Sequence, residues 1–204
     1  MKIDSGLLTD FIISIPFIVY FLHQIRSKSK YYIFKCFVIS FLCFYTILLV
    51  KYAVFPIYIS GSIKEMMREE LSFSESLAEN INLIPFVRGW YPKDFILNII
   101  MTLPLGVLLP CLIKGMTRKS MTIVGLGVGI AIELVQFLIF LFQGFTFRDI
   151  NINDSLANAI GVIIGFAIYT FAVRIFIEET KSTQIKTLRM VRNFLIDQGQ
   201  FTDG

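Results

Sequence analysis

Histidine, cysteine and charged side chains are scarce in this sequence, and their scarcity excludes several kinds of chemistry. His23 is the only histidine among 204 residues, and Asp, Glu, Lys and Arg together make up 17% of the chain. The three cysteines, Cys36, Cys43 and Cys111, show no metal-ligand spacing. One histidine leaves no Ser-His-Asp or Cys-His nucleophile set, and no Gly-rich phosphate loop is present. We therefore expect no metal and no cofactor.

Apolar residues are abundant by contrast. They make up 55% of the chain, and the mean hydropathy is +0.72. A soluble domain of this size would leave too much apolar surface in water, so the composition predicts a multi-pass membrane protein with an all-α fold. A transmembrane helix needs about 20 apolar residues. We expect about five spans, at residues 7–22, 32–55, 95–113, 120–142 and 154–177.

The basic residues predict the orientation of these spans. They follow the first, third and fifth spans, as Arg26, Lys28 and Lys30, then Lys114, Arg118 and Lys119, then Lys181, Lys186, Arg189 and Arg192. Loops rich in Lys and Arg stay in the cytoplasm, so we expect the N-terminus outside and the C-terminus inside. These loops account for the net charge of +4, and we expect no nucleic-acid partner.

The order of the spans divides the chain into four parts. Residues 1–55 hold two N-terminal spans, and residues 56–94 form an outer loop. Within this loop, residues 62–71 fit either a helix on the membrane surface or an ordinary solvated helix. Residues 95–178 hold a core of three spans, and residues 179–204 form a basic cytoplasmic tail.

Glu133 lies within an otherwise uncharged span, and this placement is the strongest functional signal in the sequence. A carboxylate inside a membrane costs about 2.5–3.5 kcal/mol on insertion scales, so such residues usually mark a functional site. Gln136 lies three residues on, on the same helical face. The alternative is a structural polar pair that holds helices together.

Other polar side chains are expected at a similar depth. Glu133 and Gln136 lie ~13 Å and ~9 Å below the outer end of their span at 1.5 Å per residue. Asn98, Asp154 and Asn158 lie in the first turns of two spans that enter from the outside. All five therefore fall in the outer half of the membrane. If the three helices pack together, these side chains line one polar pocket open to the outer face.

Two loop segments are expected near this pocket. Arg148 and Asp149 precede the last span and could close the pocket as a lid. Pro85 prevents the segment that begins at Asn82 from continuing as a regular helix. We expect this segment to fold over the pocket mouth and the Asn82 amide to brace the helix end near Asp154. The alternative is an ordinary turn re-entering the membrane.

Gly161 and Gly165 form a small-xxx-small pair in the last span. Such pairs let another helix approach closely. We expect a helix contact there, and an oligomer contact through the same glycines stays open.

An ordered series of short motifs carries a resemblance to a known family. The series is Asn82-Leu83-Ile84-Pro85-Phe86, Asn98, Leu103-Pro104-Leu105-Gly106, Glu133-xx-Gln136-Phe137 and Asp154-xxx-Asn158-xx-Gly161. Together these motifs resemble the VanZ-like family of bacterial membrane proteins. The resemblance covers about residues 82–165, and the first two spans and the tail contribute nothing to it.

The resemblance implies a multi-pass protein of the bacterial cytoplasmic membrane. The founding member of the family lowers susceptibility to the glycopeptide antibiotic teicoplanin. The family commonly has Asp-Ile-x-Asp before the last span, whereas this chain has Asn151-Ile152-Asn153-Asp154. Any function that needs both acids of that motif, such as metal binding or a proton-sharing pair, is thereby weakened.

Three functions are compatible with the pattern. In the first, the pocket engages a lipid-linked envelope precursor, another lipid or a lipidated glycopeptide. In the second, the protein is an intramembrane enzyme on a lipid-linked substrate, with Glu133 as general acid or base. Asn98, Gln136 and Asn158 would then orient the substrate, and Arg148 would meet a phosphate. The third is a transporter, which the lack of inverted repeats disfavours.

Overall fold

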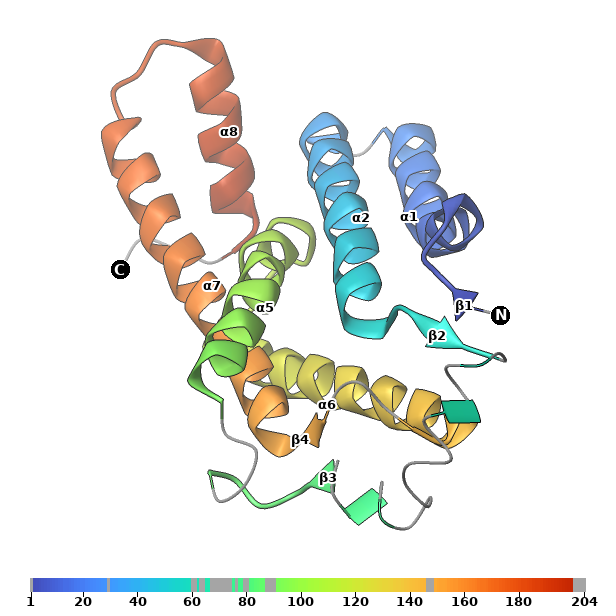
Figure 1. The fold of residues 1–204 in the computed structure, drawn as a ribbon. Helices are drawn as coiled ribbons and strands as arrows, with labels where there is room; N and C mark the ends of the chain where they lie inside the picture. Colours follow the sequence, from blue (N-terminus) through green and yellow to red (C-terminus); the bar gives the residue numbers. More distant parts are fainter. Residues whose placement is uncertain are drawn as a thin grey trace.

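Five long helices make up most of the computed structural model, which describes residues 2–28, 30–59, 62, 65–66, 75, 77–78, 81–86, 91–145 and 149–199. The helices are α1 (Leu7–Ser27), α2 (Tyr32–Val54), α5 (Pro92–Leu112), α6 (Arg118–Gln143) and α7 (Ile152–Glu179), followed by the shorter α8 (Lys186–Asp197) (Figure 1). Each of the five is long and apolar enough to cross a membrane. The predicted all-α bundle with five spans is therefore confirmed, and its orientation stays a prediction. Most of the expected outer-loop helix at 62–71 lies outside the described residues.

Capping side chains determine where the helices begin and end. α6 starts at a capping box, in which the Thr117 side chain accepts from the Ser120 backbone N–H and the Ser120 side chain accepts from the Thr117 N–H. It ends at Gly144, whose φ of +83° suits glycine. α7 is capped by the Asn151 side chain, which accepts from the Asn153 N–H. Both helices thus start two residues before the predicted spans, because caps rather than hydropathy set their first turns.

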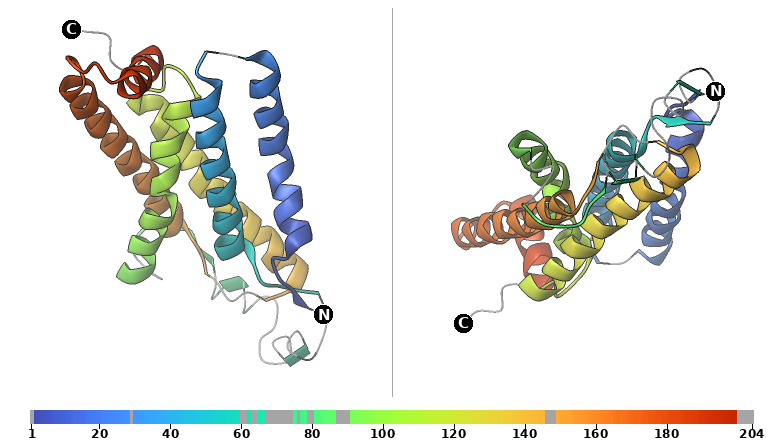
Figure 2. Two further views of the ribbon diagram at one scale, coloured as in Figure 1. Left: turned by 90° about the horizontal axis from the view of Figure 1, so that it is seen from above. Right: turned by 60° about the horizontal axis from the view of Figure 1, so that its bottom comes forward.

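α7 packs along both α5 and α6, and its glycines make this close approach possible (Figure 2, right). A Cβ added to Gly161 would overlap the Ile99 carbonyl oxygen and the Thr102 hydroxyl. A Cβ added to Gly165 would overlap the Leu103 carbonyl oxygen. The expected helix contact at these glycines is therefore with α5 of the same chain. Both glycines are buried by it, so the pair lies inside the protein and not on a surface open to a second copy.

Two short strand pairs tie loops together at one end of the bundle (Figure 2, left). β1 (Lys2–Ile3) pairs antiparallel with β2 (Ile57–Tyr58), which brings the start of α1 beside the end of α2. β3 (Ile81–Asn82) pairs in parallel with β4 (Ile150–Asn151). The second pair places the segment before α5 against the start of α7, where the predicted polar residues lie.

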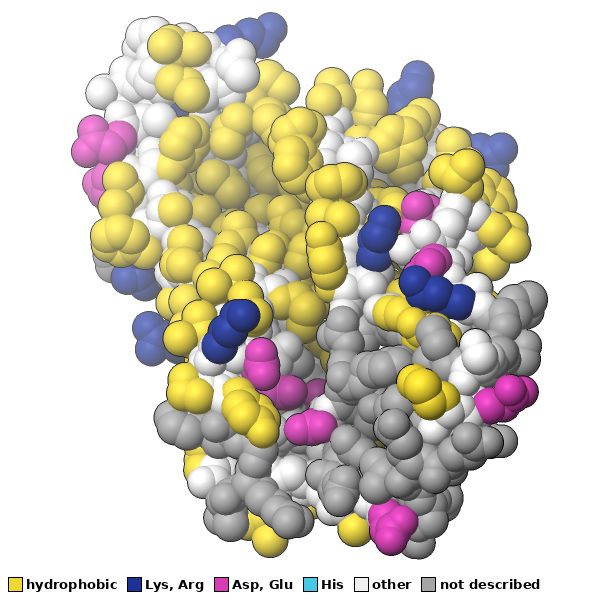
Figure 3. Space-filling view, viewed as in Figure 1, with side chains coloured by type: hydrophobic (Ala, Val, Ile, Leu, Met, Phe, Trp, Pro, Cys, Tyr) yellow, Lys and Arg dark blue, Asp and Glu magenta, His cyan; other side chains and the backbone are white. Residues whose placement is uncertain are grey.

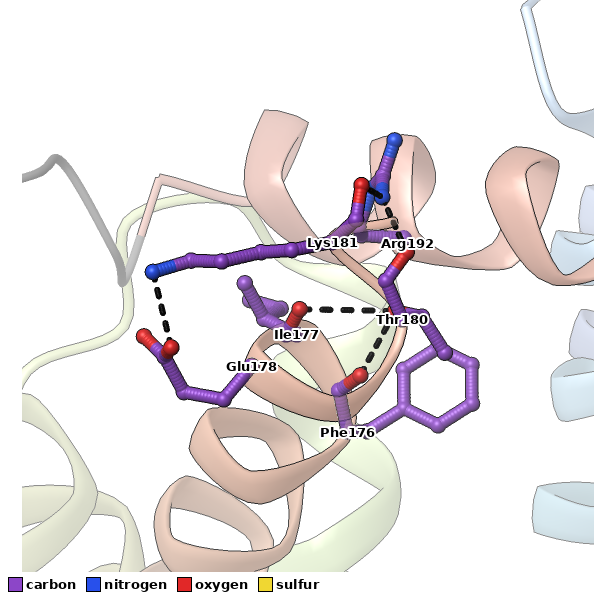
Figure 4. A network of polar contacts seen from close by, with 6 residues as sticks. All are labelled: Phe176, Ile177, Glu178, Thr180, Lys181 and Arg192. Carbon is purple, nitrogen blue, oxygen red and sulfur yellow. Dashed lines mark hydrogen bonds and ion pairs between the residues drawn. The ribbon is translucent and has the colours of Figure 1, made fainter. Parts of the chain in front are cut away.

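α8 is held against the other end of the bundle by the turn that precedes it. The Arg192 guanidinium donates to the backbone carbonyls of Thr180 and Lys181, where α7 ends (Figure 4). The Thr180 hydroxyl donates in turn to the Phe176 carbonyl at 2.6 Å. These bonds satisfy carbonyl groups that a helix C-terminus leaves without intrahelical partners.

α8 also contacts the two turns that join the other spans at this end. The Phe194 side chain is 3% exposed, and its ring lies 5.5 Å from that of Tyr31 and 5.6 Å from that of Phe34. The Gly115 N–H donates to the Gln198 carbonyl at 2.8 Å. The tail, for which the sequence predicted only a basic character, therefore joins the α1–α2 turn, the α5–α6 turn and the end of α7.

Candidate functional site

A cavity of about 820 Å³ brings together four of the predicted site residues. Asn98 of α5, Glu133 and Gln136 of α6, and Asp154 of α7 all line it. The remaining lining residues come from α2, α5 with its N-cap, and the segment before α7, and they are Tyr52, Tyr91, Asp94, Leu97, Ile100, Met101, Asp149 and Asn151. The cavity lies at the end of the bundle opposite α8, and this agrees with the expected convergence of polar side chains at one depth.

Glu133 connects the cavity to the start of α7. Its side chain is buried, with 9% exposure, and Oε2 accepts a hydrogen bond of 2.8 Å from the Asn151 backbone N–H. Asn151 is the N-cap of α7, where backbone N–H groups lack intrahelical partners. The carboxyl group of Glu133 therefore anchors one helix to another while it also faces the cavity.

α2 forms part of the cavity, although the sequence motifs did not include this span. The Gln136 side-chain amide donates to the Ala53 carbonyl at 3.1 Å and so joins α6 to α2. The Tyr45 hydroxyl donates to the Met101 carbonyl at 2.8 Å and joins α2 to α5. Tyr52, near the end of α2, lines the cavity between these two connections. The sequence did offer a signal for Tyr52. It lies near the end of an apolar run, and tyrosines concentrate at membrane interfaces.

Asn82 and Pro85 lie in the segment before α5, outside the set of residues that line the cavity. The Asn82 side-chain amide donates to Asn151 Oδ1 at 3.1 Å, so it braces the start of α7 as expected. Beyond Pro85 the chain turns, with a φ of +60° at Phe86, and the Phe86 N–H donates to Asn153 Oδ1 at 2.9 Å. Neither Asn82 nor Pro85 lines the cavity itself. Asn82 reaches the lining through its bond to Asn151, which does line the cavity.

Two predicted residues stand apart from the lining. Asn158 is fully buried between α5 and α7, where the Thr102 hydroxyl lies 2.8 Å from the Asn158 carbonyl oxygen and 3.0 Å from that of Asn98. The side-chain amide of Asn158 has no hydrogen-bond partner within the described part of the chain. The sequence predicted Asn158 in the pocket, but the packing of α5 against α7 buries it between these two helices instead. Arg148, expected at the lid, lies outside the described residues, whereas its neighbour Asp149 lines the cavity.

The cavity is strongly acidic. Its described lining includes the carboxyl groups of Asp94, Glu133, Asp149 and Asp154, with no lysine or arginine. Burial first, and then the charge of Asp94, raise the pKa of Asp149 above its usual value. These described acids favour ligands that present ammonium, hydroxyl or amide donors. Among the described residues, no group of three or more His, Cys, Asp or Glu side chains is arranged to hold a metal ion.

Asp94 and Asp149 supply carboxyl groups near the position where the motif has Asn151 in place of an acid. The chain carries Asn151 where the family commonly has an acid, and this amide serves as a helix cap and as a partner of Asn82. Asp94 lies in the first turn of α5, and Asp149 precedes β4. No spacing rule connects these two aspartates, which are 55 positions apart, so their proximity depends on the packing of α5 against α7.

The five apolar helices, with a cavity lined by polar and apolar side chains among them, define a multi-pass membrane protein. The model of the VanZ/LLP1 family matches residues 41–176, and the chain belongs to this family. The match begins inside α2 and ends near the end of α7, so it is wider than the motif region at 82–165 and includes the helix that carries Tyr52. Neither a search of the curated proteins nor a search of the solved structures gave a match.

Proposed function

We propose that this protein lowers susceptibility to teicoplanin-type glycopeptide antibiotics by binding a lipid-linked envelope component, or a lipidated ligand, in the acidic cavity. The main support is the convergence of Asn98, Glu133, Gln136 and Asp154 on one cavity of about 820 Å³. Pockets that enclose small molecules commonly have volumes of about 300–1,000 Å³. We place the protein in the cytoplasmic membrane of a bacterium, in keeping with its family.

The lining suits an amphipathic ligand better than a wholly polar one. Carboxyl and amide groups line it together with the apolar side chains of Leu97, Ile100 and Met101. A sugar, peptide or amine head group would donate hydrogen bonds to the acids, while an attached hydrocarbon chain would meet the apolar residues. Because repulsion among neighbouring carboxylates is relieved by a bound cation, an ammonium group on the ligand would add to the affinity.

The predicted orientation places this cavity on the outer face of the membrane. The basic segments cluster at the α8 end, through Lys30, Lys114 and Lys181, and positive residues favour the cytoplasm. The cavity is at the opposite end. Glycopeptides act outside the cell, so an outward cavity would meet either the antibiotic or the envelope intermediate that it targets.

An intramembrane enzyme on a lipid-linked substrate is the alternative. It is favoured by one observation, the buried carboxyl group of Glu133 in the cavity lining. Such a group can transfer protons to or from a bound substrate. The acids among the described lining residues make a hydroxyl-bearing or amine-bearing part of the substrate the group that Glu133 would contact.

A comparison of Glu133→Gln with Glu133→Leu separates these functions. Both variants would be expressed in a strain whose glycopeptide susceptibility depends on this protein, and their amounts in the membrane would be measured. Glu133→Gln can still accept the Asn151 N–H bond but cannot act as an acid or base at neutral pH. For a binding protein we expect the glutamine variant to retain most protection and the leucine variant to lose it.

Glu178→Gln is the matched control, because it removes an exposed carboxyl group at the opposite end of the protein. It should protect like the parent protein. Loss of protection in a well-expressed Glu133→Gln would favour the enzyme. Full protection by a well-expressed Glu133→Leu would contradict any role of the cavity.

A further inference from the structure

The cavity has an opening on the side of the bundle, between α2 and α5. Six of its lining residues are also exposed at the surface. Tyr91, Asp94 and Asp149 lie near the start of α5 and just before β4, where the cavity reaches the end of the bundle. The other three, Tyr52, Leu97 and Ile100, lie on α2 and α5, with Leu97 51% and Ile100 58% exposed. A side chain that both lines a cavity and lies on the surface marks a place where the cavity reaches that surface. We call the region formed by these three residues the lateral opening.

Two hydrogen bonds bound the lateral opening. The Tyr45–Met101 bond closes the gap between α2 and α5 on the side toward the membrane centre, since Tyr45 lies ~14 Å from the end of α2. The Gln136–Ala53 bond holds the end of α2 against α6 behind the opening. α2 is thus attached at two points, and its contact with α5 leaves Tyr52 and Leu97 uncovered between them.

The lateral opening lies within the apolar part of α5, the helix that is long enough to cross a membrane. Leu97 and Ile100 are five and eight residues into α5, or ~8 Å and ~12 Å from its first residue. Figure 3 shows hydrophobic side chains around the hollow between α5 and α2, with acidic side chains gathered near the lower end of α5. A polar chamber therefore meets an apolar surface through Tyr52, Leu97 and Ile100.

We propose that the cavity is loaded sideways, by a lipid of the surrounding leaflet whose head group enters through the lateral opening while its hydrocarbon chain stays in the bilayer. This inference rests on the function proposed above and names the class of ligand. The head group carries hydroxyl or ammonium groups, because Asp94, Asp149 and Asp154 surround it. The hydrocarbon chain of the lipid lies across Leu97 and Ile100.

The volume of the cavity fits this division of the ligand. About 820 Å³ accommodates a head group of small-molecule size. The hydrocarbon chain does not have to leave the membrane, and lipid tails are as apolar as the leucine and isoleucine side chains that they would contact. The hydrocarbon chain therefore costs no free energy of transfer out of the bilayer. The polar contacts of the head group decide which lipid is bound.

Photo-crosslinking at Leu97 tests the proposal, and Leu138 provides a closely matched control. Leu97 lies five residues after the start of α5, Leu138 lies five residues before the end of α6, and their exposures are 51% and 55%. Leu138 does not line the cavity. A benzophenone amino acid would replace each leucine in separate proteins. The membranes would be irradiated, and the lipids attached to the purified proteins would be identified by mass spectrometry.

We expect bulk membrane lipids at Leu138. At Leu97 we expect at least a fivefold enrichment of one lipid class with a hydroxyl-rich or amine-bearing head group, and Glu133→Leu should abolish the enrichment. The same lipid profile at both positions would overturn the proposal. A benzophenone at Ile100 provides a second position if the Leu97 variant does not reach the membrane. If an adduct at Leu97 forms only when a lipidated glycopeptide is added, the ligand is the antibiotic. That result would contradict a membrane lipid as the occupant.

The outcome is separable from that of the susceptibility test. Enrichment at Leu97 together with full protection by Glu133→Leu would support the lipid site and show that protection does not depend on the cavity. Loss of protection in Glu133→Leu, with equal profiles at Leu97 and Leu138, would support the resistance function and reject sideways loading.

Discussion

The Glu133 carboxylate accepts a 2.8 Å hydrogen bond from the Asn151 backbone N–H, and this bond joins two helices across 18 positions of the chain. The same carboxyl group lines the cavity. One side chain therefore serves both the packing of the helices and the proposed ligand site. Any functional test of Glu133 needs a measurement of stability beside it.

Replacement of Glu133 should affect stability according to whether the Asn151 N–H keeps its acceptor. In Glu133→Leu this buried donor loses its partner, and we expect a loss of about 1–3 kcal/mol. In Glu133→Gln the amide oxygen takes over, and the loss should be below about 1 kcal/mol. Thermal unfolding of the purified variants in detergent gives the comparison. Equal stability of the two variants would show that this bond does not hold α6 to α7.

Gly161→Ala should destabilise the protein by about 1–3 kcal/mol, because the new methyl group would overlap the Ile99 carbonyl oxygen and force α5 away from α7. Gly127→Ala is the control, since nothing lies within 4 Å of a Cβ at that position. It should have the stability of the parent protein or slightly more, because alanine favours a helix over glycine. Thermal unfolding and the amount of each variant in the membrane would be compared. Similar behaviour of the two variants would contradict the tight α5–α7 contact.

Arg192→Met should loosen the tail. It removes the charged donor to the Thr180 and Lys181 carbonyls, and hydrogen bonds of charged groups contribute about 1.5–3 kcal/mol. Arg189→Met removes the same charge from the exposed face of α8 and is the matched control. The expected result is faster protease cleavage of the tail in Arg192→Met only. Equal cleavage of both variants would indicate that charge, and not the capping contact, holds α8.

Asp149→Asn should stabilise the protein at neutral pH. The raised pKa of Asp149 means that the folded protein binds this proton more tightly than the unfolded chain does. Its contribution to stability therefore falls as the pH rises from the ordinary value of 3.8 through the folded pKa, and it stays constant above that. Unfolding temperatures across this range should show a gain for Asp149→Asn that disappears toward acid pH. A gain independent of pH would rule out ionisation of Asp149 as its cause.

Cysteine labelling tests the predicted orientation. Asp4→Cys and Gln184→Cys place exposed thiols at opposite ends of the bundle. If the N-terminus is outside, a membrane-impermeant thiol reagent should label Asp4→Cys in intact cells and label Gln184→Cys only after permeabilisation. The parent protein, with Cys36, Cys43 and Cys111, gives the background. The reverse pattern would place the cavity on the cytoplasmic side and contradict the proposed access for glycopeptides.

The sequence by itself determined the five spans and the common depth of the main polar residues. Length and hydropathy are local properties, and a helix rises by a constant amount per residue. The depth of Asn98, Glu133, Gln136 and Asp154 therefore followed from their distance to the ends of the apolar runs. Their presence in one cavity agrees with that reasoning.

Only the tertiary structure decided which side chains face one another. Asn158 and Asp154 are one turn apart on α7, yet Asp154 lines the cavity and Asn158 is buried beside Thr102. The addition of Tyr52 and Asp94 likewise depends on how α2 and α5 are rotated and packed. Those rotations result from contacts between distant segments, such as the glycine-mediated approach of α5 to α7, and no spacing along the chain encodes them.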